Sequence, residues 1–295
     1  MPVFNAAGSL ALAVRSTLAA MPQDAELVVL NDGSSDNSLA MLHQMAEKHP
    51  RMRVMSNREN TGVAATLGQL LDSCDSAIVA RMDADDIALP WRFRIQRQCL
   101  VSSGVDAIFS TVVHYAPQQL KIWPQRALRI TPDKAPFALL LGNPFAHSTL
   151  MAWTESIHAV GGYREVPSED YDLWLRLALS KRRLLRTRMP TVLYRHHPSQ
   201  VTLNDDWLRR AQYDTLTANV HAELSQQLLG WEDPVFFALR GDLLSADDVR
   251  VVTKFLSIVH GTWSNVLGSS RVMHRQEHIV QKRLSKAAKT VVIAV

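Results

Sequence analysis

The feature that most constrains the fold is an alternation of short apolar segments with amphipathic helical segments in the first third of the sequence. Residues 26–30 read ELVVL, which is typical of a buried strand, and the apolar residues of 39–46 recur every three or four positions, as on one helix face. A strand at 53–56, a helix around 67–71 and a strand at 77–81 continue the pattern. Because such units are joined by right-handed crossovers, the sequence predicts an α/β domain with a mainly parallel sheet flanked by helices.

The central part of the chain continues this pattern less regularly. Pro90 suits the first turn of a helix that reaches about residue 102, and residues 107–114 are a further predicted strand. Ser168 precedes an acid-rich helix start, and residues 184–194 return as a strand, whereas residues 115–150 give no assignment. From Asp205 onward only long helical patterns follow, so we expect one domain at 1–204 and a C-terminal helical extension at 205–295.

The N-terminus does not fit this scheme. The chain opens with MPVFN, which is a loop sequence, where such a domain would first need a buried strand. The first strand is therefore expected to be missing, either because the sequence starts too late or because another segment fills that position in the sheet.

Composition narrows the class of protein. Hydrophobic residues make up 47% of the chain and charged residues 20%, which argues against disorder. The net charge of +4 is concentrated late in the chain, so we expect no nucleic-acid partner. No run approaches the roughly 18 apolar residues of a membrane span, and no signal peptide is recognisable. Cys74 and Cys99 form neither a C-x-x-C pair nor a zinc spacing, which favours a reducing cytoplasm.

The strongest chemical signal is the sequence MDADD directly after the strand at 77–81. The carboxylates of Asp83, Asp85 and Asp86 repel one another, and such a cluster at a strand end indicates a bound cation. Mg²⁺ or Mn²⁺ would suit, because one or two carboxylates leave coordination sites open for diphosphate oxygens. The alternative is an acidic turn that caps the following helix.

Asp32 lies in a second polar loop, NDGSSDNS, at the end of an earlier predicted strand. Its short acidic side chain could accept hydrogen bonds from a base or ribose, or it could be an ordinary turn and cap residue. A calcium loop is rejected, because that loop needs Gly at its sixth position and Glu at its twelfth, where this chain has Asn37 and His43.

Carboxylates also open the helix that follows Ser168. Glu169, Asp170 and Asp172 suit the positive end of a helix dipole, and capping alone would explain them. A general base needs the same setting, because it must be held within about 3 Å of the hydroxyl that it deprotonates. Trp174 in this helix is expected in the core.

Two adjacent histidines, His196 and His197, follow the last predicted strand. Neighbouring side chains point in different directions, so at most one of them is expected to face a site. A neutral imidazole can complete a magnesium or manganese sphere, although a single histidine is usually structural. His147, in NPFAHSTLM, is a similar but weaker candidate.

Taken together, these segments resemble the family 2 glycosyltransferases, which have the GT-A fold. The likeness covers about residues 1–204 and depends on PVFNA at 2–6, NDGSSDNS from Asn31, NTG from Asn60, RMDADDI from Arg81, GGYRE from Gly161, EDYDLWLRL from Glu169 and YRHHPSQVT from Tyr194. Asn31 stands where an acid is common in this family, which bears on base recognition.

The resemblance implies a role for each matching residue. Asp170 would be the catalytic base, and Asp83 and Asp85 would form the D-x-D motif, with Asp85 preferred as the direct metal ligand. His197 matches the late histidine of the family and would contact the metal or the diphosphate. The implied substrate-binding residues are Pro2, Phe4, Asn5, Asp32, Asn60, Gly62, Arg81, Asp83 and Glu169.

The implied activity is an inverting transfer from a nucleoside diphosphate sugar, with a UDP-sugar preferred, to a saccharide or lipid-linked acceptor. Cell-surface polysaccharide or lipopolysaccharide synthesis is the expected setting. Two other classes of protein share some of these features. A haloacid dehalogenase-type phosphatase needs Thr or Val two residues beyond its second Asp and has its motif early in the chain, whereas here Asp86 and Ile87 follow Asp85, which argues against this class. The other class is a non-catalytic sugar-nucleotide-binding scaffold, to which the missing strand gives some weight.

The end of the chain has a basic amphipathic pattern. Basic residues recur at helical spacing from Arg271 to Lys289, opposite a face that runs from Met273 to Val291. Such a helix could lie on the anionic cytoplasmic face of the inner membrane, which would make the protein peripheral there. The alternative is a helix packed on the catalytic domain with its basic face in water.

Overall fold

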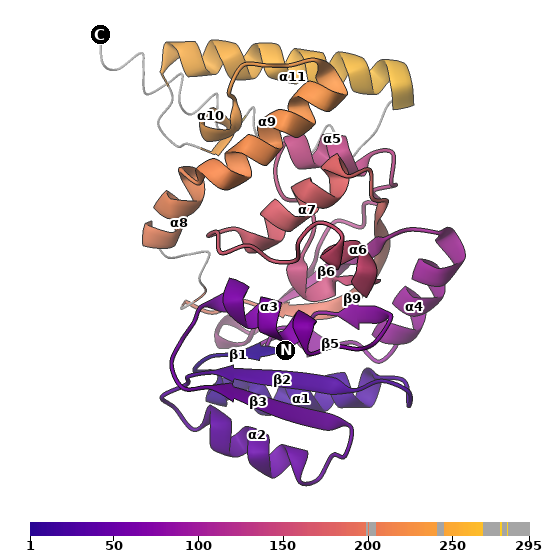
Figure 1. Cartoon of the computed structure of the whole chain (residues 1–295), viewed down its shortest axis with the longest axis vertical. Helices are drawn as coiled ribbons and strands as arrows, with labels where there is room; N and C mark the ends of the chain where they lie inside the picture. The colour runs from indigo at the N-terminus through magenta and orange to yellow at the C-terminus, as the bar shows by residue number, and fades with distance from the viewer. Residues whose placement is uncertain (199, 201–204, 241–244, 268–277, 279–281, 283–295) are drawn as a thin grey trace.

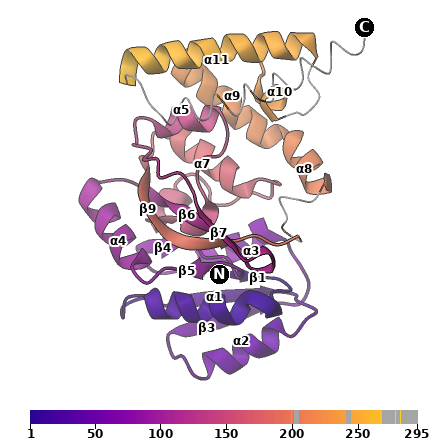
Figure 2. The same ribbon diagram turned by 180° about the vertical axis from the view of Figure 1, so that it is seen from behind.

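The computed structural model describes the chain except for residues 199, 201–204, 241–244, 268–277, 279–281 and 283–295. A three-stranded sheet with its helices, a six-stranded sheet and a group of C-terminal helices follow one another along the longest axis (Figures 1 and 2). Both the alternating first part and the late helices were predicted from sequence.

The three-stranded sheet is parallel, as predicted. Its strands β1 (Pro2–Val3), β2 (Leu27–Asp32) and β3 (Met52–Asn57) pair in the order β1-β2-β3. Helices α1 (Ala7–Ala20), α2 (Ser38–Ala46) and α3 (Val63–Asp72) flank it.

The expectation of a missing first strand was wrong, because the opening residues form β1. Pro2 pairs with Leu30, Val3 pairs with Asn31, and the Leu30 N–H donates to the Met1 carbonyl at 3.0 Å. The Val3 side chain is 1% exposed and belongs to the core. A strand of two residues is too short to show the alternation by which strands are recognised in a sequence.

The six-stranded sheet is mixed, so the prediction of a mainly parallel arrangement holds only for the other sheet. Its strands pair in the order β4-β8-β6-β9-β5, and β7 pairs with β6. Only β6 and β9 run parallel, and the remaining pairs are antiparallel. The strands are β4 (Ile78–Ala80), β5 (Ile87–Ala88), β6 (Ala107–Ala116), β7 (Lys121–Pro124), β8 (Met151–Trp153) and β9 (Leu184–Arg195).

The helices around this sheet contribute residues to the larger of the two hydrophobic clusters. They are α4 (Arg92–Ser103), α5 (Ala135–Leu140), α6 (Thr154–His158) and α7 (Glu169–Leu179), with 3₁₀ turns η1 (Pro117–Gln119) and η2 (His147–Thr149). Trp174 is fully buried in α7, as predicted, and packs edge-on against Phe109. Ser168 stands at the N-cap of α7, but its hydroxyl accepts from Arg240 instead of capping the helix.

The C-terminal helices share this core. They are α8 (Asp205–Gln212), α9 (Thr215–Leu229), α10 (Phe236–Arg240) and α11 (Ala246–Leu267). Leu224 of α9 and Phe255 of α11 are fully buried in the same cluster as Trp174. The boundary near residue 204 stays a prediction. The basic pattern from Arg271 to Lys289 falls almost wholly outside the described residues.

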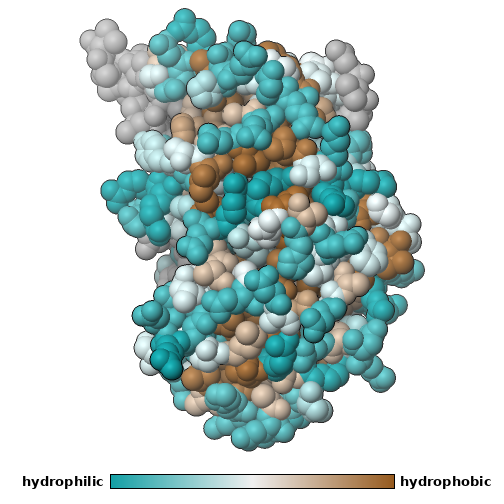
Figure 3. Space-filling model, viewed as in Figure 1, coloured by the Kyte–Doolittle hydropathy of each residue, from teal (hydrophilic) through white to brown (hydrophobic). Residues whose placement is uncertain are grey.

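Within the described part of the chain, no helix has both the length and the apolar character that crossing a membrane requires. On the face in Figure 3, hydrophilic residues predominate and apolar residues gather in separate groups.

Candidate active site

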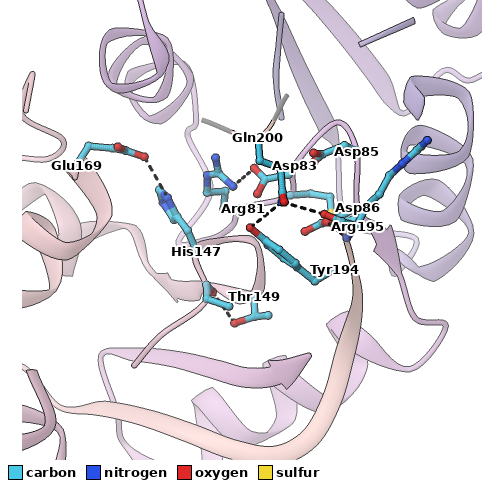
Figure 4. A network of polar contacts seen from close by, with 12 residues as sticks. Arg81, Asp83, Asp85, Asp86, His147, Thr149, Glu169, Tyr194, Arg195 and Gln200 are labelled. Atoms are coloured by element: carbon cyan, nitrogen blue, oxygen red, sulfur yellow. Dashed lines mark hydrogen bonds and ion pairs between the residues drawn. The ribbon is translucent and has the colours of Figure 1, made fainter. Parts of the chain in front are cut away.

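The acidic cluster lies in the loop between β4 and β5. Asp83, Asp85 and Asp86 each place a carboxylate oxygen within 4.8 Å of the others (Figure 4). Burial alternates along this loop. The side chains of Asp83 and Asp85 keep 25% and 33% of their surface exposed. The residues that alternate with them are buried, namely Met82, Ala84 and Asp86. The two carboxylates of the D-x-D motif are therefore accessible, and the third lies beneath them.

Asp86 ties the cluster to the end of β9. The Arg195 N–H donates to Asp86 Oδ1 at 2.8 Å, and Asp86 is 1% exposed. Burial, with a further contribution from the charge of Asp85, raises the pKa of Asp86 to about 7. Asp86 therefore serves to anchor the loop.

Two arginines oppose the charge of this loop. Arg81 forms an ion pair with Asp83, and its side chain is largely buried. Arg92 is fully buried beneath the loop, where it donates to the Arg81 carbonyl and, through Nε at 3.2 Å, to Gln96. Burial lowers the pKa of Arg92 to about 9, which still leaves the guanidinium charged at neutral pH.

His197 reaches the cluster from beyond β9. Its Nε2 atom lies 2.9 Å from Asp85 Oδ2, although 112 residues separate the two in sequence. The predicted metal ligands Asp83, Asp85 and His197 are thus brought together. Oxygen donors with one imidazole nitrogen fit a hard to borderline divalent cation, so the residues present suit Mg²⁺ or Mn²⁺.

Asp32 lies at the carboxyl end of β2 and is 4% exposed. Its oxygens accept from Asn57 Nδ2, from both the N–H and the hydroxyl of Thr61, all at 2.9 Å, and from the Gly62 N–H at 3.0 Å. Burial alone would raise the pKa of Asp32, but these hydrogen bonds outweigh it and lower the pKa. The ionised carboxylate therefore holds the loop after β3.

Asn5 organises the neighbouring loop at the end of β1. It adopts a left-handed conformation with φ 48°, and its Oδ1 atom accepts from the Ser35 N–H at 2.9 Å. Phe4 beside it is 49% exposed. Phe4 and Asn5 thus lie at the carboxyl end of β1, beside Asp32 and the loop that includes Asn60 and Gly62. Pro2 begins β1 and pairs with Leu30.

Asp170 lies in the first turn of α7. Its Oδ2 atom accepts from Asn143 Nδ2 at 2.7 Å and its Oδ1 atom from the Tyr171 N–H at 2.6 Å. Burial, with the adjacent charge of Glu169, raises the pKa of Asp170. A carboxylate with a raised pKa is a stronger base in its ionised form.

Glu169 faces a buried histidine. Its Oε1 atom lies 3.5 Å from His147 Nδ1, and His147 Nε2 lies 2.9 Å from the Tyr163 hydroxyl. Burial lowers the pKa of His147 well below its ordinary value, so this imidazole is neutral at neutral pH. His147, a weaker metal candidate in the sequence, is not part of the acidic cluster.

Tyr194 lies near both the acidic cluster and Asp170. Its pKa is raised to about 12, by burial first and then by the charges of Asp86 and Asp85, with a smaller contribution from Asp170. Asp85 of the D-x-D motif and Asp170 therefore both act on this hydroxyl, which indicates that they border a common region. Arg81 lies within it, between the D-x-D side and His147 with Glu169 (Figure 4).

The comparison with known families settles the family of the chain. The sequence profile described as "Glycosyl transferase family 2" matches residues 1–161, more than half of the chain. The chain belongs to this family. The resemblance seen in the sequence motifs is thereby confirmed.

Among curated proteins, the putative glycosyltransferase EpsE of Bacillus subtilis (strain 168) is similar to this chain. It is 29% identical over 182 residues, which cover 60% of this chain and 64% of EpsE. The chain thus spans less than two thirds of the length of this relative.

Solved structures support the same fold. S. aureus TarS 1-349 in complex with UDP-GlcNAc matches with a TM-score of 0.61 at 13% identity, over 97% of this chain and 87% of that one. The mannosyltransferase PcManGT from Pyrobaculum calidifontis, in complex with GDP-Man and Mn²⁺, matches with a TM-score of 0.56 at 18% identity, over 97% and 84%. At such identities the likeness shows the fold alone, and the fold is GT-A.

The family match ends at residue 161, so it covers the predicted site residues from Pro2 to Asp85 but not those that come later in the chain. Glu169, Asp170 and His197 lie beyond it, and their assignment rests on the geometry described above.

Sequence reasoning on this family 2 chain missed three residues that support the site. Arg92 and Gln96 line one helix face below the D-x-D loop, and Asn143 orients Asp170 from a region without any assigned pattern. Arg92, Gln96 and Leu100 are spaced by four residues, a pattern that marks a common helix face in the sequence.

Proposed function

We propose that this family 2 protein moves a sugar from a nucleoside diphosphate sugar, a UDP-sugar, to an acceptor hydroxyl with inversion at the anomeric carbon. The observation that carries the proposal is the place of Arg81 between two acidic groups (Figure 4). Its guanidinium pairs with Asp83 of the D-x-D motif on one side, and on the other side lies His147, which contacts Glu169 next to Asp170. Such a transfer needs both a cation at the departing diphosphate and a base at the acceptor.

Asp83, Asp85 and His197 are the residues that would hold the metal. A bound divalent cation would stabilise the negative charge that develops on the departing diphosphate. The imidazole in the donor set favours Mn²⁺ over Mg²⁺, because Mg²⁺ prefers oxygen ligands.

Asp170 is the proposed base. Both of its oxygens are oriented by hydrogen bonds, one from the Asn143 side chain and one from the Tyr171 N–H, and each keeps acceptor capacity for a hydroxyl proton. Deprotonation of the acceptor hydroxyl as it attacks opposite the diphosphate gives one displacement. An α-linked donor would therefore yield a β-linked product.

The nucleotide is proposed to lie along the carboxyl ends of β1 to β3. Phe4 offers an exposed ring face to a base, and Asp32 holds the backbone of the loop at Asn60 to Gly62 in place. Arg81 would face the diphosphate, while Glu169 supports the opposite wall through its contact with His147. The proposed substrate-binding set also includes Pro2, Asn5 and Asp83.

We infer a setting in cell-surface polysaccharide or lipopolysaccharide synthesis, as the family resemblance implies. The free thiols of Cys74 and Cys99 fit a reducing cytoplasm. A lipid-linked acceptor would bring the protein to the cytoplasmic face of the inner membrane, where peripheral contact is part of the proposal.

The proposal is tested by heat-unfolding of the full chain with a panel of UDP- and GDP-sugars, each with and without Mn²⁺. We expect one UDP-sugar to raise the melting temperature only when the metal is present, and slow metal-dependent hydrolysis of that sugar to follow. Binding without any hydrolysis or transfer would favour a non-catalytic scaffold. No response to any nucleotide sugar would contradict the proposed function.

A further inference from the structure

The hairpin of β6 and β7 carries an exposed indole beside the site. Trp123 pairs with His114 across the hairpin, and all four residues of β7 are exposed. The Trp123 residue keeps 39% of its surface exposed.

Two imidazoles support one face of this indole. The Trp123 ring stacks on His114 at 5.4 Å with an interplanar angle of 21°, and on His196 at 5.1 Å with an angle of 26°. The two imidazoles are 5.0 Å apart. These three distances form a nearly equilateral triangle, so both imidazoles lie on the same side of the indole. The surface of Trp123 that stays exposed therefore lies away from the two imidazoles.

Hydrogen bonds and ring contacts hold the two imidazoles that stack on Trp123 in place. His114 Nδ1 and His196 Nε2 share a hydrogen bond of 2.9 Å, and the His196 N–H donates to the Tyr115 carbonyl at 2.7 Å. Tyr194 packs edge-on against both imidazoles, at 6.0 and 5.3 Å. A ring held in this way binds a ligand with little loss of conformational entropy.

The stacked group adjoins the acidic cluster. His196 stands between Arg195, whose N–H donates to Asp86, and His197, whose imidazole contacts Asp85. Tyr194 packs on the imidazoles with its ring, while its hydroxyl lies in the field of the site carboxylates. The indole is thus anchored by the same end of β9 that meets the D-x-D loop.

We propose that the outer face of Trp123 binds the pyranose ring of the acceptor saccharide by stacking. The negative face of an indole attracts the C–H groups on the apolar face of a sugar, and no charge is required on either partner. The acceptor is favoured over the nucleoside of the donor, because Phe4 and Asp32 lie at the ends of strands of the three-stranded sheet, whereas Trp123 lies on the six-stranded sheet. This inference rests on the proposed function.

The test observes the indole directly. The full chain is labelled with 5-fluorotryptophan at its seven tryptophans, and the Trp123 resonance is assigned by its loss in Trp123→Phe. Methyl glycosides of glucose, galactose, mannose and N-acetylglucosamine are titrated at high millimolar concentration in the presence of UDP and Mg²⁺. Trp91, which is 37% exposed, is the matched control indole, assigned with Trp91→Phe.

We expect at least one glycoside to shift the Trp123 resonance and to leave that of Trp91 in place. Trp123→Ala should weaken the binding or raise the acceptor KM of that glycoside by about tenfold, the upper range for one aromatic contact. Acceptor-independent hydrolysis of the donor should change less than about twofold, because the metal and nucleotide residues are untouched.

The inference is overturned if no glycoside shifts Trp123 while UDP still protects the protein from heat in a metal-dependent way. It is also overturned if Trp123 responds only to the UDP-sugar, or only to vesicles of phosphatidylethanolamine and phosphatidylglycerol. Loss of metal-dependent nucleotide binding in the unmodified protein would instead contradict the proposed function, and this inference with it.

Discussion

At the scale of single residues, the site depends on how each carboxylate is paired. Asp32 and Asp86 are buried and fixed by N–H donors from neighbouring loops, so they shape the backbone. Asp83, Asp85 and Asp170 keep accessible oxygens. Metal binding and proton transfer are therefore assigned to Asp83, Asp85 and Asp170. Substitution of these residues should affect activity, whereas substitution of Asp32 or Asp86 should affect the structure of the loops.

Replacing the proposed base tests this division. Asp170→Asn should lower kcat by about 10²- to 10⁴-fold, because the amide cannot take the acceptor proton, while metal-dependent donor binding is retained. Steady-state kinetics and heat-unfolding with the donor measure the two effects. Glu165→Gln, at an exposed carboxylate of the same segment, should change neither. Normal turnover in Asp170→Asn would exclude this residue as the base.

The pH dependence of the activity should change when the hydrogen bond from Asn143 to Asp170 is removed. The base works ionised, so activity falls as the pH drops through the raised pKa of Asp170. Asn143 donates to the carboxylate and lowers that pKa, so Asn143→Ala should move the acid limb of kcat/KM to higher pH. A pH–rate profile of both proteins measures the shift. An unchanged limb, or one moved to lower pH, would show that Asn143 does not act through Asp170.

At the scale of elements, two loops at the carboxyl ends of β2 and β3 interlock through Gly33. A methyl group on Gly33 would lie 2.4 Å from the Glu59 carbonyl carbon, and its φ of 65° favours glycine. The close approach brings the loop after β3 onto Asp32. Sequence patterns mark Gly33 as a turn residue but do not reveal what it packs against.

Substitution at this contact should therefore be costly. Gly33→Ala should lower the free energy of unfolding by about 2 kcal/mol or more, from backbone strain together with the clash. Gly68→Ala is the matched control, since Gly68 lies within α3 and a methyl group there would meet nothing within 4 Å. That change should stabilise by up to about 1 kcal/mol through helix propensity. Equal effects in denaturant unfolding would contradict the interlock.

The elements that sequence analysis predicted are the ones with enough residues to show a period. The strand of residues 26–30 and the acid-rich helix start at 169 are observed nearly where expected. β1 and β8 have two and three residues, too few for a pattern, and α1 was not assigned. The D-x-D motif is visible because three acids adjoin in the chain, whereas Arg92 and Asn143 matter only through partners that folding brings to them.

At the scale of the whole molecule, the C-terminal helices are part of the main core. Leu224 of α9 is fully buried in the cluster that also holds Leu177 of α7. Because α9 packs on α7 and α5, the helical extension supports the helix that carries Asp170. A change in the extension should therefore affect the stability of the whole protein.

Two substitutions in α9 test this coupling. Leu224→Ala should lower the free energy of unfolding by about 2–5 kcal/mol, the usual cost of a cavity in a core, and should leave a single unfolding transition. Leu216→Ala, at a side chain that is 50% exposed on the same helix, should change it by less than about 0.5 kcal/mol. A separate early transition in Leu224→Ala would show that the extension unfolds independently.

The most direct test of the account is calorimetric titration of the full chain with UDP, in the presence and absence of Mn²⁺. We expect Mn²⁺ to tighten UDP binding at least about tenfold in the unmodified protein, and this effect to vanish in Asp85→Asn. Glu155→Gln, at an exposed acid of α6, should keep the full metal effect. Equal dependence on Mn²⁺ in Asp85→Asn and in the unmodified protein would contradict a metal site built on the D-x-D carboxylates.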